Sequence, residues 1–238
     1  MKLKKIISIS ILMVVNFSVN ALQLDKMIIV SDKNSNGILT LTNDEDDIIF
    51  VDSKVEEISI SNGTEIKKKK YTRQNLEDWK ISLTNQKLIL KPGQEKVVGI
   101  RSLCSESKCE NDKDLMFLTT FYPSPYLKEE NDNSSIQVNF GFAPVYVIPT
   151  KNPEFSYELI NQGDRLHVIN DSNTLINIYA NSCEGQNKQA CQKMYTVLAG
   201  REKSFKLPSV MQSESINVTV TSHDRSYTEK YTLELRGM

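Results

Sequence analysis

Four cysteines are the residues of this 238-residue chain with the most defined chemistry. Cys104 and Cys109 are separated by four residues, and Cys183 and Cys191 by seven. An even number of cysteines favours disulfides if the chain is exported, and the simplest pairing is Cys104–Cys109 with Cys183–Cys191. In the loop-entropy model each of these small loops stabilises the fold by roughly 2 kcal/mol. Zinc is the competing interpretation, but the sequence has no C-x-x-C motif.

The other groups that could do chemistry are scattered along the chain. His167 falls in a predicted strand and His223 beside a predicted turn, where histidines are usually structural. The acidic run at 44–47 lacks the spacing of a calcium loop and is typical of a solvated turn. There is no nucleophile motif and no glycine-rich phosphate loop. We therefore expect no enzymatic activity, no cofactor and no metal, and the net charge of −1 does not point to nucleic acid.

The stretch 136–149 carries the strongest pattern in the chain. Its first half alternates strictly, with Ile136, Val138, Phe140 and Phe142 on one face, which predicts a strand. From residue 143 onward both faces are apolar, so this half is expected to be buried on both sides. Pro144 lies between the halves and argues for an edge strand or a bulge. An apolar edge strand must be covered, either by its own fold or by a partner.

Residues 1–21 read as a secretory signal peptide. Three lysines at positions 2, 4 and 5 precede an apolar run that is too short to span a membrane, and 19–21 offers small residues for cleavage. An uncleaved anchor is the alternative. Removing three of the 29 basic residues against 30 acidic ones leaves a mature chain of about −4. We expect an exported protein with no stable membrane insertion.

The elements that position these residues are predicted to be short strands joined by turns. Seven or so strands end near residue 149, beginning with one strand over Leu22–Ser31, and this is typical of an immunoglobulin-like sandwich. Thr150–Pro153 is the predicted linker, and a second set of strands follows. The fold class is therefore all-β, with immunoglobulin-like domains at 22–149 and 150–238.

The order of these features resembles the PapD-like periplasmic chaperones of the chaperone–usher pilus pathway. Four pieces, spread over nearly all of the mature chain, carry the resemblance. They are the opening strand pair with its asparagine turn, the L-K-P-G segment that ends in Arg101, the hairpin that ends in an apolar strand and a proline, and the second domain's asparagine and Ala-Gly turns. These are residues 24–43, 88–101, 117–149, and 168–172 with 195–200.

The resemblance implies two immunoglobulin-like domains in a boomerang arrangement and a periplasmic chaperone function. In that family the last strand of the first domain lends alternating apolar side chains to a pilus subunit, and the subunit passes to an outer-membrane usher. The matching positions here are Ile136, Val138, Phe140 and Phe142. Donation of a strand is β-augmentation, and four such side chains at roughly 2 kcal/mol each would be a large driving force. The alternative is that these side chains face their own domain's core.

The chain departs from the best-known branch of the family at its carboxylate anchors. The arginine and lysine that hold the subunit's C-terminus there match Ile28 and Pro144 here. The segment after Pro144 is similar to the archaic-like or alternative branch, and Lys26, Arg101 and Lys151 are the replacement candidates. The alternative for each of the three is an ordinary surface charge, and Arg101 could equally be a structural ion-pair partner. The competing function is an exported immunoglobulin-like binding or adhesion module whose strand at 136–149 is internal.

Overall fold

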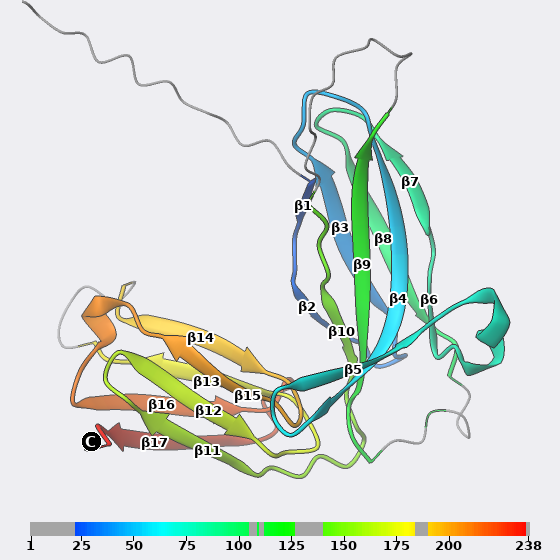
Figure 1. Cartoon of the computed structure of the whole chain (residues 1–238). Helices are drawn as coiled ribbons and strands as arrows, with labels where there is room; N and C mark the ends of the chain where they lie inside the picture. The colour runs from blue at the N-terminus through cyan, green and yellow to red at the C-terminus, as the bar shows by residue number, and fades with distance from the viewer. Residues whose placement is uncertain (1–21, 105–108, 110–111, 127–139, 184–189, 237–238) are drawn as a thin grey trace, which may run out of the picture.

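The computed structural model describes residues 22–104, 109, 112–126, 140–183 and 190–236. Within these residues the chain folds into two β-sandwiches, one after the other along the sequence (Figure 1). We call residues 22–148 the first sandwich and residues 157–234 the second sandwich. Their strands run at a steep angle to each other, like the arms of a boomerang (Figure 1). The expected all-β fold with two immunoglobulin-like sandwiches is confirmed.

The first sandwich consists of two sheets in the described residues, which we name after their central strands. The β8 sheet has the order β1-β3-β8-β6, and the β9 sheet has the order β2-β10-β9-β4-β5, with β7 also paired to β4. The strands are β1 (Leu22–Leu24), β2 (Ile28–Val30), β3 (Gly37–Asn43), β4 (Ile49–Ser61), β5 (Glu65–Lys70), β6 (Ile81–Leu83), β7 (Lys87–Leu90), β8 (Glu95–Ser102), β9 (Leu115–Pro125) and β10 (Val145–Ile148). A short 3-10 helix, η1 (Arg73–Asp78), joins β5 to β6.

The second sandwich also has two sheets in the described residues. The first has the order β11-β12-β15 and the second the order β14-β13-β16-β17. The strands are β11 (Tyr157–Asn161), β12 (Arg165–Asn170), β13 (Ile176–Asn181), β14 (Gln192–Val197), β15 (Glu202–Lys206), β16 (Ser215–Thr221) and β17 (Thr228–Glu234), and a 3-10 turn, η2 (Ser209–Met211), precedes β16.

The chain enters the first sandwich by changing sheets, so the single strand expected over Leu22–Ser31 is wrong. β1 pairs with β3 in the β8 sheet, whereas β2 pairs with β10 in the β9 sheet. The crossing starts at Asp25, whose side chain accepts a hydrogen bond of 2.8 Å from the N–H of Thr40. This first segment therefore closes one side of the sandwich by serving both sheets.

Alternating apolar residues build a separate core for each sandwich. In β3, for example, Leu39 and Leu41 are fully buried while their neighbours are partly exposed, as a period of two requires. Each sandwich also buries an asparagine at a strand end. Asn43 donates to the C=O groups of Asp47 and Leu90, and Asn170 makes the equivalent bonds around its own turn. The accepting residues Leu90, Thr174 and Val197 are buried, so the two asparagines supply hydrogen-bond donors to carbonyls that water does not readily reach.

Both predicted disulfides are present. Cys104 is bonded to Cys109 and Cys183 to Cys191, with Cα–Cα distances of 5.4 and 5.1 Å. Each closes a short loop at the edge of one sandwich, so neither disulfide links the two sandwiches.

Candidate functional site

The last strand of the first sandwich, β10, is buried and hydrogen-bonded on both sides. It runs antiparallel to β9 and parallel to β2. The N–H of Val145 donates to the C=O of Met27, and the C=O of Val147 accepts from the N–H of Ser31, both at 2.9 Å. The expectation that this half is buried on both faces is confirmed, since both Tyr146 and Val147 are fully buried.

Tyr146 fixes this half of the strand to the domain core. Its hydroxyl donates a 2.7 Å hydrogen bond to the C=O of Ser35. Burial raises the pKa of the Tyr146 hydroxyl above its usual value near 10, so the group keeps its proton at neutral pH. The buried donor is therefore satisfied, and the ring adds a large apolar surface to the core.

Pro144 interrupts the strand without shifting its register. Phe142 pairs with Phe121 through two main-chain bonds of 2.7 and 3.0 Å, which continues the register in which Val145 faces Leu118. There is consequently no bulge at this proline. Its C=O still accepts from Thr119, through both the N–H and the hydroxyl. One ladder bond is lost here because proline has no N–H.

Before Pro144 the outer edge of the strand has no partner among the described residues. The main-chain groups of Phe142 point to β9, so those of Gly141 and Ala143 point the other way. The parallel register of β2 would set Lys26 opposite Ala143, where the chain is already crossing between sheets. Neither Gly141 nor Ala143 makes a main-chain hydrogen bond to any described residue. Unpaired N–H and C=O groups of this kind are a template for another strand.

The side chains on this open segment are unevenly covered. Phe140 is 73% exposed, whereas Phe142 is partly buried and packs against the first sandwich's core. For Phe142 the geometry therefore favours the alternative, in which the side chain faces the core of its own domain. Ile136 and Val138, the other two predicted donor positions, lie outside the described residues.

Gly141 brings the open segment unusually close to β9. A Cβ at this position would lie 2.9 Å from the main-chain oxygen of Phe121 and 3.2 Å from the Tyr122 ring. A larger residue would have to push against main chain, so glycine permits the close approach of the two strands. Sequence reasoning placed Gly141 on the face opposite the phenylalanines but did not identify this packing role.

The three candidate cations are not brought together. Lys26 lies nearest the open edge by register, and its Nζ is 3.6 Å from the Asp25 carboxylate. Arg101 is exposed on β8, in the other sheet. Lys151 is exposed beyond the far end of β10.

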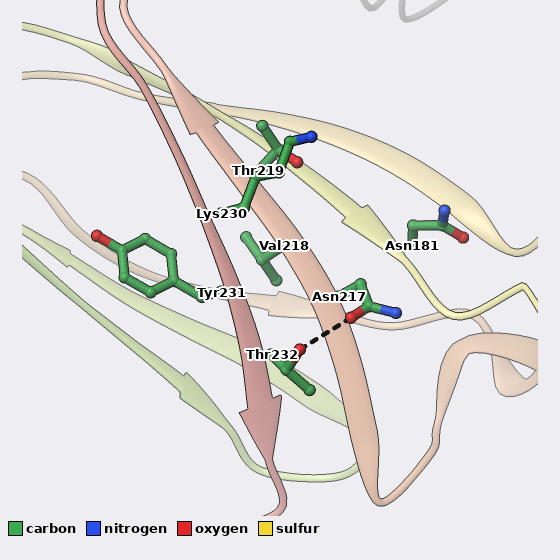
Figure 2. Close-up of a pocket in the computed structure, with 7 residues that line it drawn as sticks. All are labelled: Asn181, Asn217, Val218, Thr219, Lys230, Tyr231 and Thr232. Carbon is green, nitrogen blue, oxygen red and sulfur yellow. Dashed lines mark hydrogen bonds between the residues drawn. The ribbon is translucent and has the colours of Figure 1, made fainter.

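A second surface feature is the shallow hollow on the outer face of the second sandwich. Figure 2 shows its lining from β13, β16 and β17, where the Thr232 hydroxyl donates 3.0 Å to the Asn217 side chain. The lining consists of amides and hydroxyls with one lysine, Lys230, and one apolar residue, Val218. Such groups lack a nucleophile–base pair. Across the described residues no three His, Cys, Asp or Glu side chains gather to hold a metal, and no helix in this part of the chain is long and apolar enough to cross a membrane.

Comparisons with known proteins bear on the family and the fold. Residues 24–149 match the family model of the CS5 fimbrial protein N-terminal domain. A search of curated proteins found no match. Among solved structures, the class 5 fimbriae chaperone CfaA is 13% identical, with a TM-score of 0.52, covering 91% of this chain and 100% of that one. A complex of the Salmonella enterica SafA pilin with the SafB chaperone is 12% identical, with a TM-score of 0.52, and the match covers 92% of this chain and 99% of that one.

The E. coli chaperone DraB is similar at 16% identity and a TM-score of 0.50, covering 91% of this chain and 97% of that one. At such identities the likeness shows a shared fold. That fold is the two-domain arrangement of PapD-like pilus chaperones. CfaA, SafB and DraB are described as chaperones.

Proposed function

The chain belongs to the family of the CS5 fimbrial protein N-terminal domain, and from this premise we propose that it is a periplasmic chaperone for pilus subunits. It holds a subunit by donating the open edge that precedes Pro144 and delivers the subunit to an outer-membrane usher. The proposal includes export by a cleaved signal peptide at 1–21 and domain limits of 22–149 and 150–238.

The observation that carries the proposal is the edge at Gly141 and Ala143, which no described residue pairs, with exposed Phe140 beside it. Strand addition needs free main-chain groups for affinity and alternating side chains for specificity. Gly141 and Ala143 support the first requirement among the described residues, and the alternation of Ile136, Val138 and Phe140 in the sequence supports the second. Burying one phenylalanine side chain contributes about 2 kcal/mol. In this proposal Ile136, Val138 and Phe140 enter the subunit, while Phe142 serves mainly as the segment's attachment to its own domain.

A binding or adhesion module is the competing function. In such a module the strand at 136–149 would be internal and would not need an unpaired edge. The open main chain of Gly141 and Ala143 favours the chaperone.

The test is co-expression with candidate pilus subunits and recovery of the complex. Phe140→Asp is expected to abolish recovery because it places a charge in an apolar subunit groove. The matched control is Val97→Asp, which changes another exposed apolar residue, 57% exposed, on β8 in the other sheet of the same sandwich. If Phe140→Asp leaves recovery at the wild-type level while the protein is folded, strand donation is wrong.

The anchor of the subunit's C-terminal carboxylate is assigned within this proposal to Lys26, in preference to Arg101 or Lys151. Its position opposite the unpaired Ala143 supports this choice. Lys26→Gln is expected to weaken subunit recovery, and Arg101→Gln serves as the comparison, with its exposed cation on the opposite sheet.

A further inference from the structure

Asp114 is a buried carboxylate at the place where the two sandwiches meet. It is only 5% exposed and immediately precedes β9. Its Oδ1 accepts from the N–H of Thr150, at 2.9 Å, and its Oδ2 accepts from the N–H of Leu175, at 2.8 Å. The Thr174 hydroxyl donates to the same carboxylate. One side chain thus connects the first sandwich, the linker and the second sandwich.

The main chain around Asp114 strengthens the same connection. Its N–H donates to the C=O of Asn173 at 2.8 Å. The Asn173 side chain in turn donates to the C=O groups of Asp112 and Asn152, at 2.7 and 2.9 Å. The turn before β13 is therefore tied to β9 and to the linker by several directional bonds.

An apolar cluster shields these polar contacts. Leu175, whose N–H binds Asp114, buries its side chain against Ile58, Met116 and Val147 of the β9 sheet. Exclusion of water strengthens hydrogen bonds and makes an unpaired carboxylate costly. The cluster and the carboxylate therefore depend on the same alignment of the two sandwiches.

A second contact lies at the tip of the hairpin formed by β4 and β5, which reaches the second sandwich (Figure 1). The N–H of Glu202 donates to the C=O of Gly63 at 2.8 Å, and the Arg201 guanidinium donates to the C=O of Thr64 at 2.7 Å. A groove of about 430 Å³ runs between this tip and Asp114. Two contacts on either side of a groove resist both bending and twisting, which a single contact would allow.

The Asp114 contact also lies at one end of the β9–β10 ladder, and the open edge lies at the other. Leu115 pairs with Ile148, so Asp114 and Thr150 flank the last rung of that ladder. The open segment at Gly141 follows the same register toward the opposite end. A hydrogen-bonded strand pair thus connects the domain joint to the open edge.

We propose that Asp114 is a positioning residue that holds the second sandwich at a fixed angle to the open edge of the first. Its carboxylate receives N–H donors from the linker and from the second sandwich at once, so it fixes both segments to the end of β9. The additional statement that subunit capture needs this angle rests on the proposed function.

Residual dipolar couplings measured by NMR test the joint. A rigid pair of sandwiches fits one alignment tensor, and we expect this for the wild-type protein. Asp114→Asn replaces one acceptor oxygen with an NH₂ group that faces an N–H donor, so we expect two tensors of different magnitude. Asp112→Asn is the matched control, because it removes the same charge two residues away from an exposed side chain, and should keep one tensor.

A single shared tensor in folded Asp114→Asn would overturn the proposal. A merely local loss of stability would not separate the tensors, because each folded sandwich would keep its orientation. If Asp114→Asn does not fold, Thr174→Val decides the matter. This variant removes one hydroxyl bond to the carboxylate at nearly constant shape, and a shared tensor identical to the wild type would then contradict the proposal.

Subunit recovery tests the functional half separately. We expect Asp114→Asn to lower recovery of a co-expressed subunit about tenfold, while Asp112→Asn leaves it unchanged. If Asp114→Asn shows separate tensors but full subunit recovery, then capture does not need a fixed angle, while the positioning role of Asp114 is still supported. If Phe140→Asp also leaves recovery unchanged, the proposed function itself fails, and the joint is judged by the tensors alone.

Discussion

The two halves of the segment around Pro144 are both apolar, but they differ in what surrounds them. Val145–Ile148 lies between β2 and β9, and its large side chain, Tyr146, is fully buried. Among the described residues, Phe140–Ala143 is bridged only to β9, and Phe140 is mostly exposed. Neighbouring strands, rather than the apolarity of the residues, therefore decide which half belongs to the core. The same chain can consequently attach a strand firmly at one end and present it at the other.

The largest effect is expected at the buried half. Tyr146→Ala should lower the free energy of unfolding of the first sandwich by about 3–5 kcal/mol, because it opens a large cavity and removes the bond to Ser35. Denaturant unfolding followed by the fluorescence of Trp79 measures this change. Trp79 is the chain's one tryptophan and stacks on Tyr71 in the first sandwich, so it reports on this domain. A loss below about 1 kcal/mol would show that the buried half is not the attachment.

The two phenylalanines of the open half should differ in how much they stabilise the first sandwich. Phe142→Ala should cost about 1–2 kcal/mol of folding free energy because its ring packs on the core, and Phe140→Ala should cost under about 0.5 kcal/mol. The same Trp79 measurement applies. Equal losses at both positions would mean that Phe140 also packs against its own domain.

The smallest effect is expected from pH at the joint. Burial outweighs three hydrogen bonds and the nearby His223, and it raises the pKa of the Asp114 carboxyl in the folded protein above the unfolded value of about 3.9. The folded state then binds more protons than the unfolded state. The stabilisation that comes from protonating Asp114 is therefore complete below about pH 4 and is lost as the pH rises through the folded pKa. Asp114→Asn removes the contribution.

The pH prediction is checked by denaturant unfolding of the wild type and Asp114→Asn from pH 4 upward. The destabilisation caused by the substitution should shrink as the pH rises. Growth of that difference with pH would mean that the carboxylate form, rather than the acid, is favoured by folding.

The sequence predicted the fold because most of its strands alternate cleanly and its turns carry the usual residues. It predicted both disulfides because each pair is close in sequence. It failed at Leu22–Ser31, where two apolar pieces flank the charged pair Asp25–Lys26 and the sequence does not reveal that β1 and β2 serve different sheets. Each apolar piece is compatible with either sheet, and only the tertiary pairing assigns it to one of them.

The candidate site was predictable in part. Alternation identified the segment before Pro144, but it treats Phe140 and Phe142 alike, whereas their distances from the domain's own core differ. The packing role of Gly141 could not be predicted, because it depends on how closely the Phe121 carbonyl of another strand approaches. Asp114 was missed for a similar reason, since a single aspartate before an apolar strand gives no sign that its partners come from the linker and from the second sandwich.

Amide hydrogen exchange tests strand donation most directly. In the free protein the amides of Gly141 and Ala143 should exchange rapidly, while those of Val145 and Tyr146 should be protected by β2 and β9. In a complex with a pilus subunit, Gly141 and Ala143 should become protected and the other two should change little. Exchange at Gly141 and Ala143 that is already slow in the free protein, or that stays rapid in the complex, would contradict strand donation.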